Sequence, residues 1–104
     1  MTIEDFSKEL NKIDIPSAYG VFQEEQTLPF ILYDTEDTQS FHADNTTYAS
    51  FENIRLELYT QFRDDDAEKK IEDLLNYNEL AYEKETEYNS EQKNRKTTFY
   101  FSLL

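Results

Sequence analysis

Hydrophobic and polar residues alternate most regularly between residues 53 and 60. Ile54, Leu56 and Leu58 lie at every second position there, with polar or charged residues between them. A period of two is typical of a strand that buries one of its faces. The segment therefore predicts a strand with its aliphatic side chains turned toward the core.

Two earlier runs also predict strands. Residues 28–33 are mostly apolar and are entered through Pro29, which lacks an N–H and belongs at a strand start or at an edge. Residues 18–23 predict a first strand, in which Gly20 permits a bulge or a close contact.

The last quarter of the chain predicts a closing hairpin. Residues 79–88 and 97–104 are the two strands, and the charged residues 89–96 are the expected turn. One face of the final strand is strongly apolar, with Phe99, Phe101 and Leu103 at alternate positions.

Two segments show the spacing of amphipathic helices. The first is capped by Thr2 with Asp5 three residues later, ends before Pro16, and has one apolar stripe, formed by Ile3, Phe6, Leu10 and Ile13. The second is expected at Asp65 to Tyr77, where Asp65 and Glu68 form a capping pair and the apolar face comprises Ala67, Ile71, Leu74 and Leu75.

These elements follow one another as α-β-β-β-α-β-β. The sequence therefore predicts an α+β fold, an antiparallel sheet of four to five strands with two helices packed on one face. Residues 1–104 are expected to form a single domain, with a polar arm at 34–47. The expected core is the apolar side of the best-patterned elements: Ile54, Leu56, Leu58, Ile71, Leu74, Leu75, Phe99 and Phe101.

Composition narrows the classes of function. The chain has 104 residues, with 23 acidic against 10 basic side chains, and its net charge of -13 repels phosphate and anionic lipid. We therefore expect no direct nucleic-acid binding and no membrane partner. With no cysteine, disulfides and thiolate metal sites are excluded. The first residues after Met1 show no basic and apolar export signal.

Candidate chemical groups are few. His42 near Asp44 is the one possible imidazole base, but neither a nucleophile nor further ligands accompany it. The three aspartates at 64–66 lack the spacing and glycine of a calcium loop, so a helix N-terminus explains them better. Lys93, Arg95 and Lys96 are interpreted as a solvated turn. No catalytic, cofactor-binding or metal-binding residue is predicted, and the protein is expected not to be an enzyme.

Interaction is the more promising role. The connection from Asp34 to Thr47 exceeds an ordinary hairpin loop and predicts an interaction arm. The predicted contact residues are Phe41, His42, Asp44 and Asn45 of the arm and Tyr48 directly after it. Several tyrosines fall in expected strands, and the uncovered sheet face is predicted to present them together: Tyr59, Tyr82, Tyr88 and Tyr100. The alternative is that they are half-buried residues of the sheet.

Most of the chain also resembles a known family. The similar segments are residues 15–22 (IPSAYGVF), 28–33 (LPFILY), 41–45 (FHADN) with Tyr48, 56–60 (LELYT), 68–75 (EKKIEDLL) and 82–84 (YEK). They resemble the small tail-completion proteins of long-tailed phages and prophages of Gram-positive bacteria.

The resemblance implies a tail terminator or head-tail joining protein. Such a protein is an α/β subunit that assembles into a ring, commonly a hexamer, and contacts the tail tube and the head-completion proteins. It implies a virion location, at the tail end or head-tail interface, after assembly in the bacterial host cytoplasm. It implies no catalysis and no cofactor.

A second class of function stays open from the residues alone. A small acidic protein with exposed aromatic side chains can act as an inhibitor that mimics nucleic acid, as anti-restriction and immunity proteins do. That role needs carboxylates along one face, whereas the sequence distributes them over helices, loops and strands.

Overall fold

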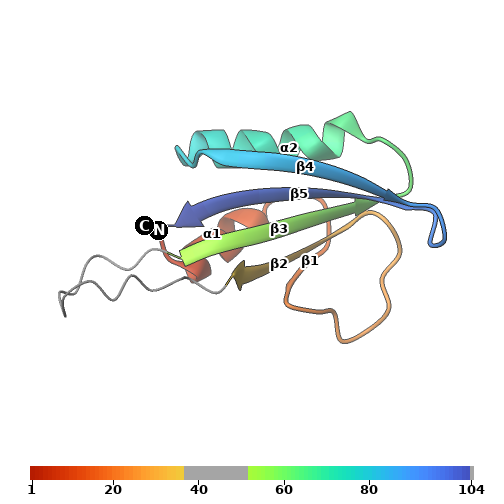
Figure 1. The fold of residues 1–104 in the computed structure, drawn as a ribbon. Coiled ribbons are helices and arrows are strands. Elements are labelled where there is room, and N and C mark those ends of the chain that lie inside the picture. The colour runs from red at the N-terminus through yellow and green to blue at the C-terminus, as the bar shows by residue number, and fades with distance from the viewer. Residues whose placement is uncertain (37–51, 104) are drawn as a thin grey trace, which may run out of the picture.

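A computed structural model describes residues 1–36 and 52–103 of the chain. Within these residues two helices and five strands form a small α+β fold (Figure 1). Their order is α1 (Ile3–Leu10), β1 (Ser17–Tyr19), β2 (Phe30–Glu36), β3 (Glu52–Thr60), α2 (Asp65–Tyr77), β4 (Tyr82–Asn89) and β5 (Asn94–Leu103).

The five strands form one mixed sheet. Its spatial order is β1-β2-β3-β5-β4, which differs from the order along the chain because β5 lies between β3 and β4. The pairs β2–β3, β3–β5 and β4–β5 are antiparallel, but β1 is parallel to β2. The prediction of a wholly antiparallel sheet is therefore wrong at its first strand.

Gly20 explains why β1 is short. Its φ of +78° lies in the left-handed region that glycine adopts readily, and its N–H donates to the carbonyl of Tyr33 at 2.8 Å. The strand ends at Tyr19, instead of reaching residue 23 as predicted. Residues 20–29 then return the chain to the end where β1 begins, so β2 runs parallel to β1. A tight hairpin loop would instead have made the two strands antiparallel.

The N-termini of both helices are capped by side chains. Thr2 Oγ1 accepts from the N–H of Asp5 at 3.1 Å, and Asp5 accepts from the N–H of Thr2, which confirms the predicted cap of α1. The bounds predicted for α2 are confirmed, but its cap lies one residue earlier, because Asp64 Oδ1 accepts from the N–H of Ala67 at 3.0 Å. Asp65 instead pairs with Arg63.

Helix α1 ends earlier than its apolar stripe. Asn11 is its C-cap, and the N–H groups of Lys12 and Ile13 bond to carbonyls three residues back, as in a tight final turn. Ile13 still packs partly buried against the core.

The β4–β5 hairpin has a shorter turn than predicted. Asn89 Oδ1 accepts from the N–H groups of Glu91 and Gln92 at 3.0 and 3.1 Å, and Lys93 has a φ of +52°, so four residues reverse the chain. Arg95 and Lys96 are therefore strand residues of β5 on opposite sheet faces, and their interpretation as part of a solvated turn is wrong.

Both helices pack on the same face of the sheet. The ring of Phe6 in α1 contacts Tyr33 at 6.1 Å and Phe101 at 5.1 Å between centroids. Helix α2 turns Ala67, Ile71 and Leu75 toward the core. Of the predicted core residues, Leu74 is the exception, because it lies on the flank of this stripe and is only partly buried.

Neither described helix could cross a membrane, since within residues 1–36 and 52–103 none is sufficiently long and apolar.

The difference between adjacent leucines of α2 is testable. We expect Leu75→Ala to lower the free energy of unfolding by about 2–5 kcal/mol, because Leu75 is fully buried. Leu74→Ala, the matched control, removes the same atoms from a half-buried position and should cost less than about 2 kcal/mol. Denaturant unfolding measures both. Equal losses would show that α2 is rotated relative to the sheet.

Candidate interaction surface

No described element covers the sheet face opposite α1 and α2, which we call the uncovered face. Four strands contribute alternate side chains to it, and cross-strand pairing orders them in rows. The rows are Asp34–Arg55–Tyr100–Glu83, Leu32–Glu57–Thr98–Glu85 and Phe30–Tyr59–Lys96–Glu87. The surface thus combines aromatic, basic and acidic side chains on a regular sheet lattice.

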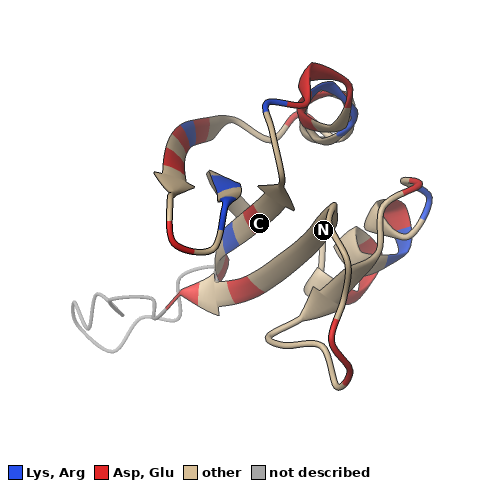
Figure 2. Cartoon of the chain, turned by 90° about the vertical axis from the view of Figure 1, so that its right-hand side faces the viewer, with Lys and Arg blue, Asp and Glu red and all other residues tan. Residues whose placement is uncertain are grey.

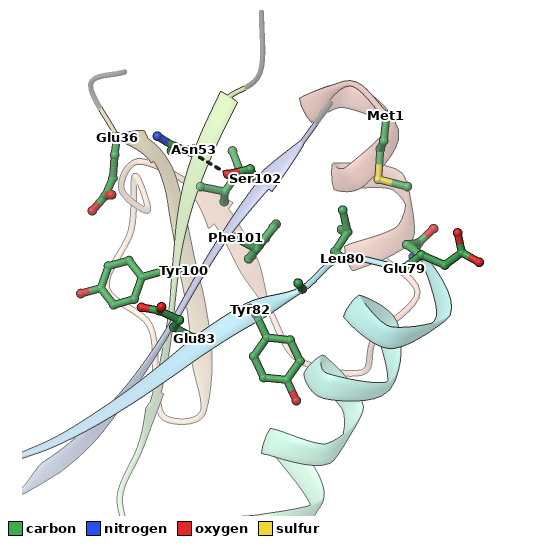
Figure 3. Close-up of a pocket in the computed structure, with 13 residues that line it drawn as sticks. Met1, Glu36, Asn53, Glu79, Leu80, Tyr82, Glu83, Tyr100, Phe101 and Ser102 are labelled. Carbon is green, nitrogen blue, oxygen red and sulfur yellow. Dashed lines mark hydrogen bonds between the residues drawn. The ribbon is translucent and has the colours of Figure 1, made fainter. Parts of the chain in front are cut away.

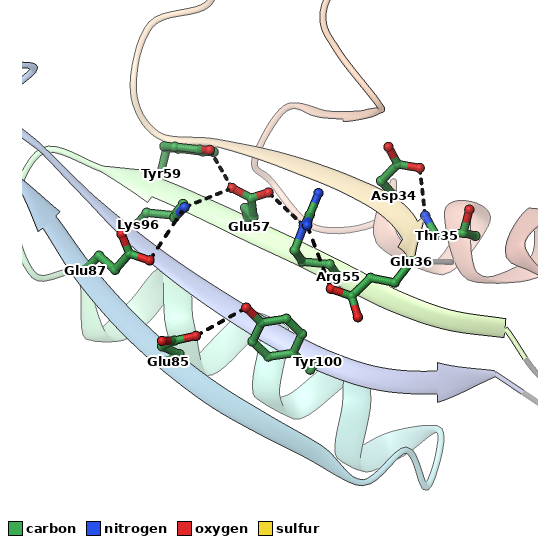
Figure 4. A network of polar contacts seen from close by, with 10 residues as sticks. All are labelled: Asp34, Thr35, Glu36, Arg55, Glu57, Tyr59, Glu85, Glu87, Lys96 and Tyr100. Carbon is green, nitrogen blue, oxygen red and sulfur yellow. Dashed lines mark hydrogen bonds and ion pairs between the residues drawn. The ribbon is translucent and has the colours of Figure 1, made fainter. Parts of the chain in front are cut away.

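Glu57 lies at the centre of the polar contacts on this face (Figure 4). The Tyr59 hydroxyl donates to Glu57 Oε2 at 2.6 Å, and Lys96 Nζ lies 3.7 Å from the same oxygen. Arg55 Nε lies 3.2 Å from Glu57 Oε1 in an ion pair that lacks the alignment of a hydrogen bond. Only 16% of the Glu57 side chain is exposed, so two cations and one neutral hydrogen-bond donor together stabilise a mostly shielded carboxylate.

The network continues toward both sides of the sheet. Arg55 Nη1 lies 3.8 Å from Glu36 Oε1 of β2, and Lys96 Nζ lies 3.8 Å from Glu87 Oε1 of β4. The Tyr100 hydroxyl donates to Glu85 Oε2 at 3.2 Å (Figure 4). The two cations are each shared between two carboxylates, so negative charge remains in excess on this face.

Both tyrosines of the uncovered face are held as neutral donors. Burial, followed by the hydrogen bond to Glu57 and its charge, raises the pKa of Tyr59 well above its ordinary value. Burial and then the hydrogen bond to Glu85 also raise the pKa of Tyr100. Each phenol therefore keeps its proton and serves to orient a carboxylate.

One end of the uncovered face is aromatic. Phe30 stacks on Tyr59 with centroids 4.9 Å apart and planes 24° apart, and Phe22 meets Phe30 edge to face at 5.6 Å. The opposite margin is the strand β4, where Glu83, Glu85 and Glu87 are all exposed. The row that begins at Phe30 thus passes from aromatic side chains on β2 and β3 to an acidic one on β4.

The structure separates the four tyrosines that were predicted to lie together. Tyr59 and Tyr100 lie on the uncovered face. Tyr82 and Tyr88 lie on the helix-covered face, where Tyr82 pairs with Phe101 and its ring lies 5.8 Å from that of Phe99. The prediction is therefore wrong for these two. Both faces of β4 are polar in sequence, and only its register against β5 decides which way its side chains point.

The predicted arm is only partly within the described residues. Asp34 to Glu36 belong to β2, so the strand extends into the segment assigned to the arm. The contact residues predicted for the arm, Phe41, His42, Asp44, Asn45 and Tyr48, all lie outside the described residues.

A second charged cluster, which the sequence did not suggest, lies between α2 and the strands. Glu68 is 7% exposed and lies 3.6 Å from Lys84 Nζ and 3.7 Å from Arg95 Nη2. Lys84 Nζ also donates to Glu72 at 2.9 Å, a bond that raises the pKa of the lysine. Glu68, Lys84 and Arg95 are far apart in sequence, and no local spacing relates them.

A pocket opens at the end of the sheet where β4 begins (Figure 3). β4 starts opposite Phe101, so β5 extends beyond it by two residues. The lining combines the apolar groups of Met1, Leu80 and Phe101 with a polar rim that includes Glu79 and Glu83.

Within residues 1–36 and 52–103, no group of three or more histidines or carboxylates could hold a metal ion. The described site is suited to contact through charge, aromatic packing and hydrogen bonding. Comparison with known proteins identified no matching family model and no curated protein with significant similarity.

The Tyr59–Glu57 bond predicts a dependence of stability on alkaline pH. The pKa of the phenol is raised on folding, so its contribution is complete below the ordinary value of about 10 and is lost as pH rises above it. We expect the free energy of unfolding to fall less steeply above pH ~10 in Tyr59→Phe than in the wild type. Tyr77→Phe, which changes an exposed tyrosine of α2, should keep the wild-type profile. Identical profiles for all three proteins would contradict this role of Tyr59.

Proposed function

We propose that this protein is a structural, non-catalytic subunit that forms a ring at the head-tail interface of a long-tailed phage and joins or terminates the tail. The observation that carries the proposal is the uncovered face, an ordered surface of aromatic, basic and acidic side chains on a rigid sheet. The resemblance to tail-completion proteins over most of the sequence supports a role for this surface in phage tail assembly.

The two edges of the sheet suit a ring subunit. Closed rings with more than two members use heterologous contacts, in which two different surfaces of the subunit meet. The sheet ends in β1 on one side and β4 on the other. Tyr19 and Val21 are exposed at the first edge, and Glu83, Glu85 and Glu87 are exposed at the second. The two edges of the protein therefore differ in chemistry, and only the second is acidic.

The charge of the protein is consistent with a passage for DNA. A net charge of -13 repels phosphate, so a ring of these subunits would surround DNA without retaining it. The tail tube and the head-completion proteins are the partners expected under this proposal.

Deleting the gene from its phage tests the proposal directly. We expect electron micrographs to show heads separate from tails, with tail tubes lacking their terminal ring or exceeding normal length. A wild-type copy supplied from a plasmid is the control and should restore complete particles. Infectious particles of normal form from the deletion strain would refute the assembly role.

The alternative is an acidic inhibitor that mimics nucleic acid. One observation favours it: Glu83, Glu85 and Glu87 follow β4 at two-residue spacing, about 6.7 Å apart, and form a regular track of carboxylates. Against it, acidic positions are found on both helices and in loops as well as on this strand (Figure 2). Under this alternative the protein would bind a basic nuclease, and duplex DNA would compete with that binding.

A further inference from the structure

β4 is an edge strand along its whole length. It pairs with β5 from Tyr82 to Asn89, and no described strand lies on its other side. Every second residue of such a strand directs its backbone N–H and C=O away from the sheet. These groups offer an extended chain a ready row of hydrogen-bonding partners.

The acidic side chains of this edge are largely uncompensated. The side chain of Glu83 makes no hydrogen bond or ion pair within the described residues, and that of Glu85 only accepts a bond from the neutral Tyr100. Glu87 lies 3.8 Å from Lys96, a cation shared with Glu57. An added strand on this edge would therefore meet negative charge at alternate positions of one face.

On the helix-covered side, the edge of β4 borders a groove beside α2. The charges of this groove are already paired, with Lys84 Nζ 2.9 Å from Glu72 and Lys69 Nζ 2.9 Å from Asp73. Small polar side chains of an added strand would fit here without leaving a charge unpaired. The two faces of the edge thus select different side chains.

A second copy of the chain is a poor strand partner for this edge, because the three residues of β1 are too few to pair with the eight of β4, and β4 would meet its own charges. Antiparallel pairing of β4 with itself places same-face residues opposite one another about a central residue. When the pairing is centred on Glu85, Glu83 faces Glu87 of the copy, and Glu85 faces Glu85 of the copy. When the pairing is centred on Lys84, Glu83 faces Glu85. When it is centred on Thr86, Glu85 faces Glu87. Like charges directly opposite are destabilising, so the three registers that pair the middle of β4 with itself are disfavoured.

We propose that β4 accepts an extended segment of a different protein as a sixth strand, with Lys or Arg at alternate positions opposite Glu83, Glu85 and Glu87. The backbone of β4 supplies the hydrogen bonds to the added strand, and the three carboxylates select a strand with basic side chains on the facing side. The inference goes beyond the proposed function and does not rest on it, because it concerns binding by the isolated protein.

The first test uses synthetic peptides of eight residues, the length of β4. The probe alternates Lys with Thr, one control groups the same four lysines at one end, and another replaces Lys by Glu. We expect the alternating peptide to bind about tenfold more tightly than the grouped one, since only it places a charge opposite each carboxylate. Titration gives the affinities, and amide exchange should show new protection confined to β4. Equal binding of the two lysine peptides, or protection elsewhere, would overturn the proposal.

The second test changes the protein. Glu83→Gln, Glu85→Gln and Glu87→Gln together should weaken the alternating peptide about tenfold. A matched variant carries Glu4→Gln, Glu24→Gln and Glu25→Gln, which removes the same charge from other exposed positions and should change binding less than about twofold. Amide spectra of both variants establish that the fold is kept. Equal weakening by both would mean that overall charge alone attracts the peptide, and the proposal would fail.

A third test isolates the backbone. An alternating peptide whose Thr amides are methylated keeps its charge but loses the donors of one edge. Strand addition requires those donors, so binding should be lost. Undiminished affinity would overturn the inference even if the glutamates contribute.

Discussion

The register of β3 against its two neighbours is the constraint on which the rest of this structure depends. Leu56 lies opposite Tyr33 of β2 and Phe99 of β5, which places three apolar side chains beneath the helices. The next residue, Glu57, therefore points to the opposite face. A slip of one residue would bury Glu57 and expose Leu56, so burial of the apolar set fixes the positions of the polar network.

Glu57 shows how this constraint becomes a surface. A carboxylate with 16% exposure would be costly without partners, and Arg55, Tyr59 and Lys96 all reach it from positions that the register sets. Because Arg55 and Lys96 both pair with Glu57 at the centre of the uncovered face, they do little to neutralise the carboxylates at its margins. The uncompensated charge is found at Glu83 and its neighbours on β4, the strand with an open edge.

The sequence predicted those elements whose signals are local. Alternation in β3, the cap at Thr2 and the apolar stripe of α2 each arise within one segment, and the structure confirms them except for Leu74, which is only partly buried. Longer-range features were missed. The parallel pairing of β1 depends on where the loop after Gly20 returns, and the facing of Tyr82 depends on the register of β4 with β5.

The same limit applies to the interaction surface. Tyr59 and Tyr100 could be placed on it because their strands have one clearly apolar face, whereas β4 has none. The cluster of Glu68, Lys84 and Arg95 had no sequence signal, because it joins α2, β4 and β5 across the fold. Arg95 was assigned to a turn on its charge alone, and only the pairing of β5 shows that it is a strand residue.

The asymmetry of the sheet constrains how copies of this chain can pair. β4 disfavours its own copy by charge, and β1, with three residues, is too short to offer an extended ladder. Isologous dimers through sheet edges are therefore disfavoured at both sides. Under the proposed function this is an advantage, because subunits that do not pair in solution stay available until a tube end gathers them and raises their local concentration. Edge composition would then restrict ring formation to the place where the tail ends.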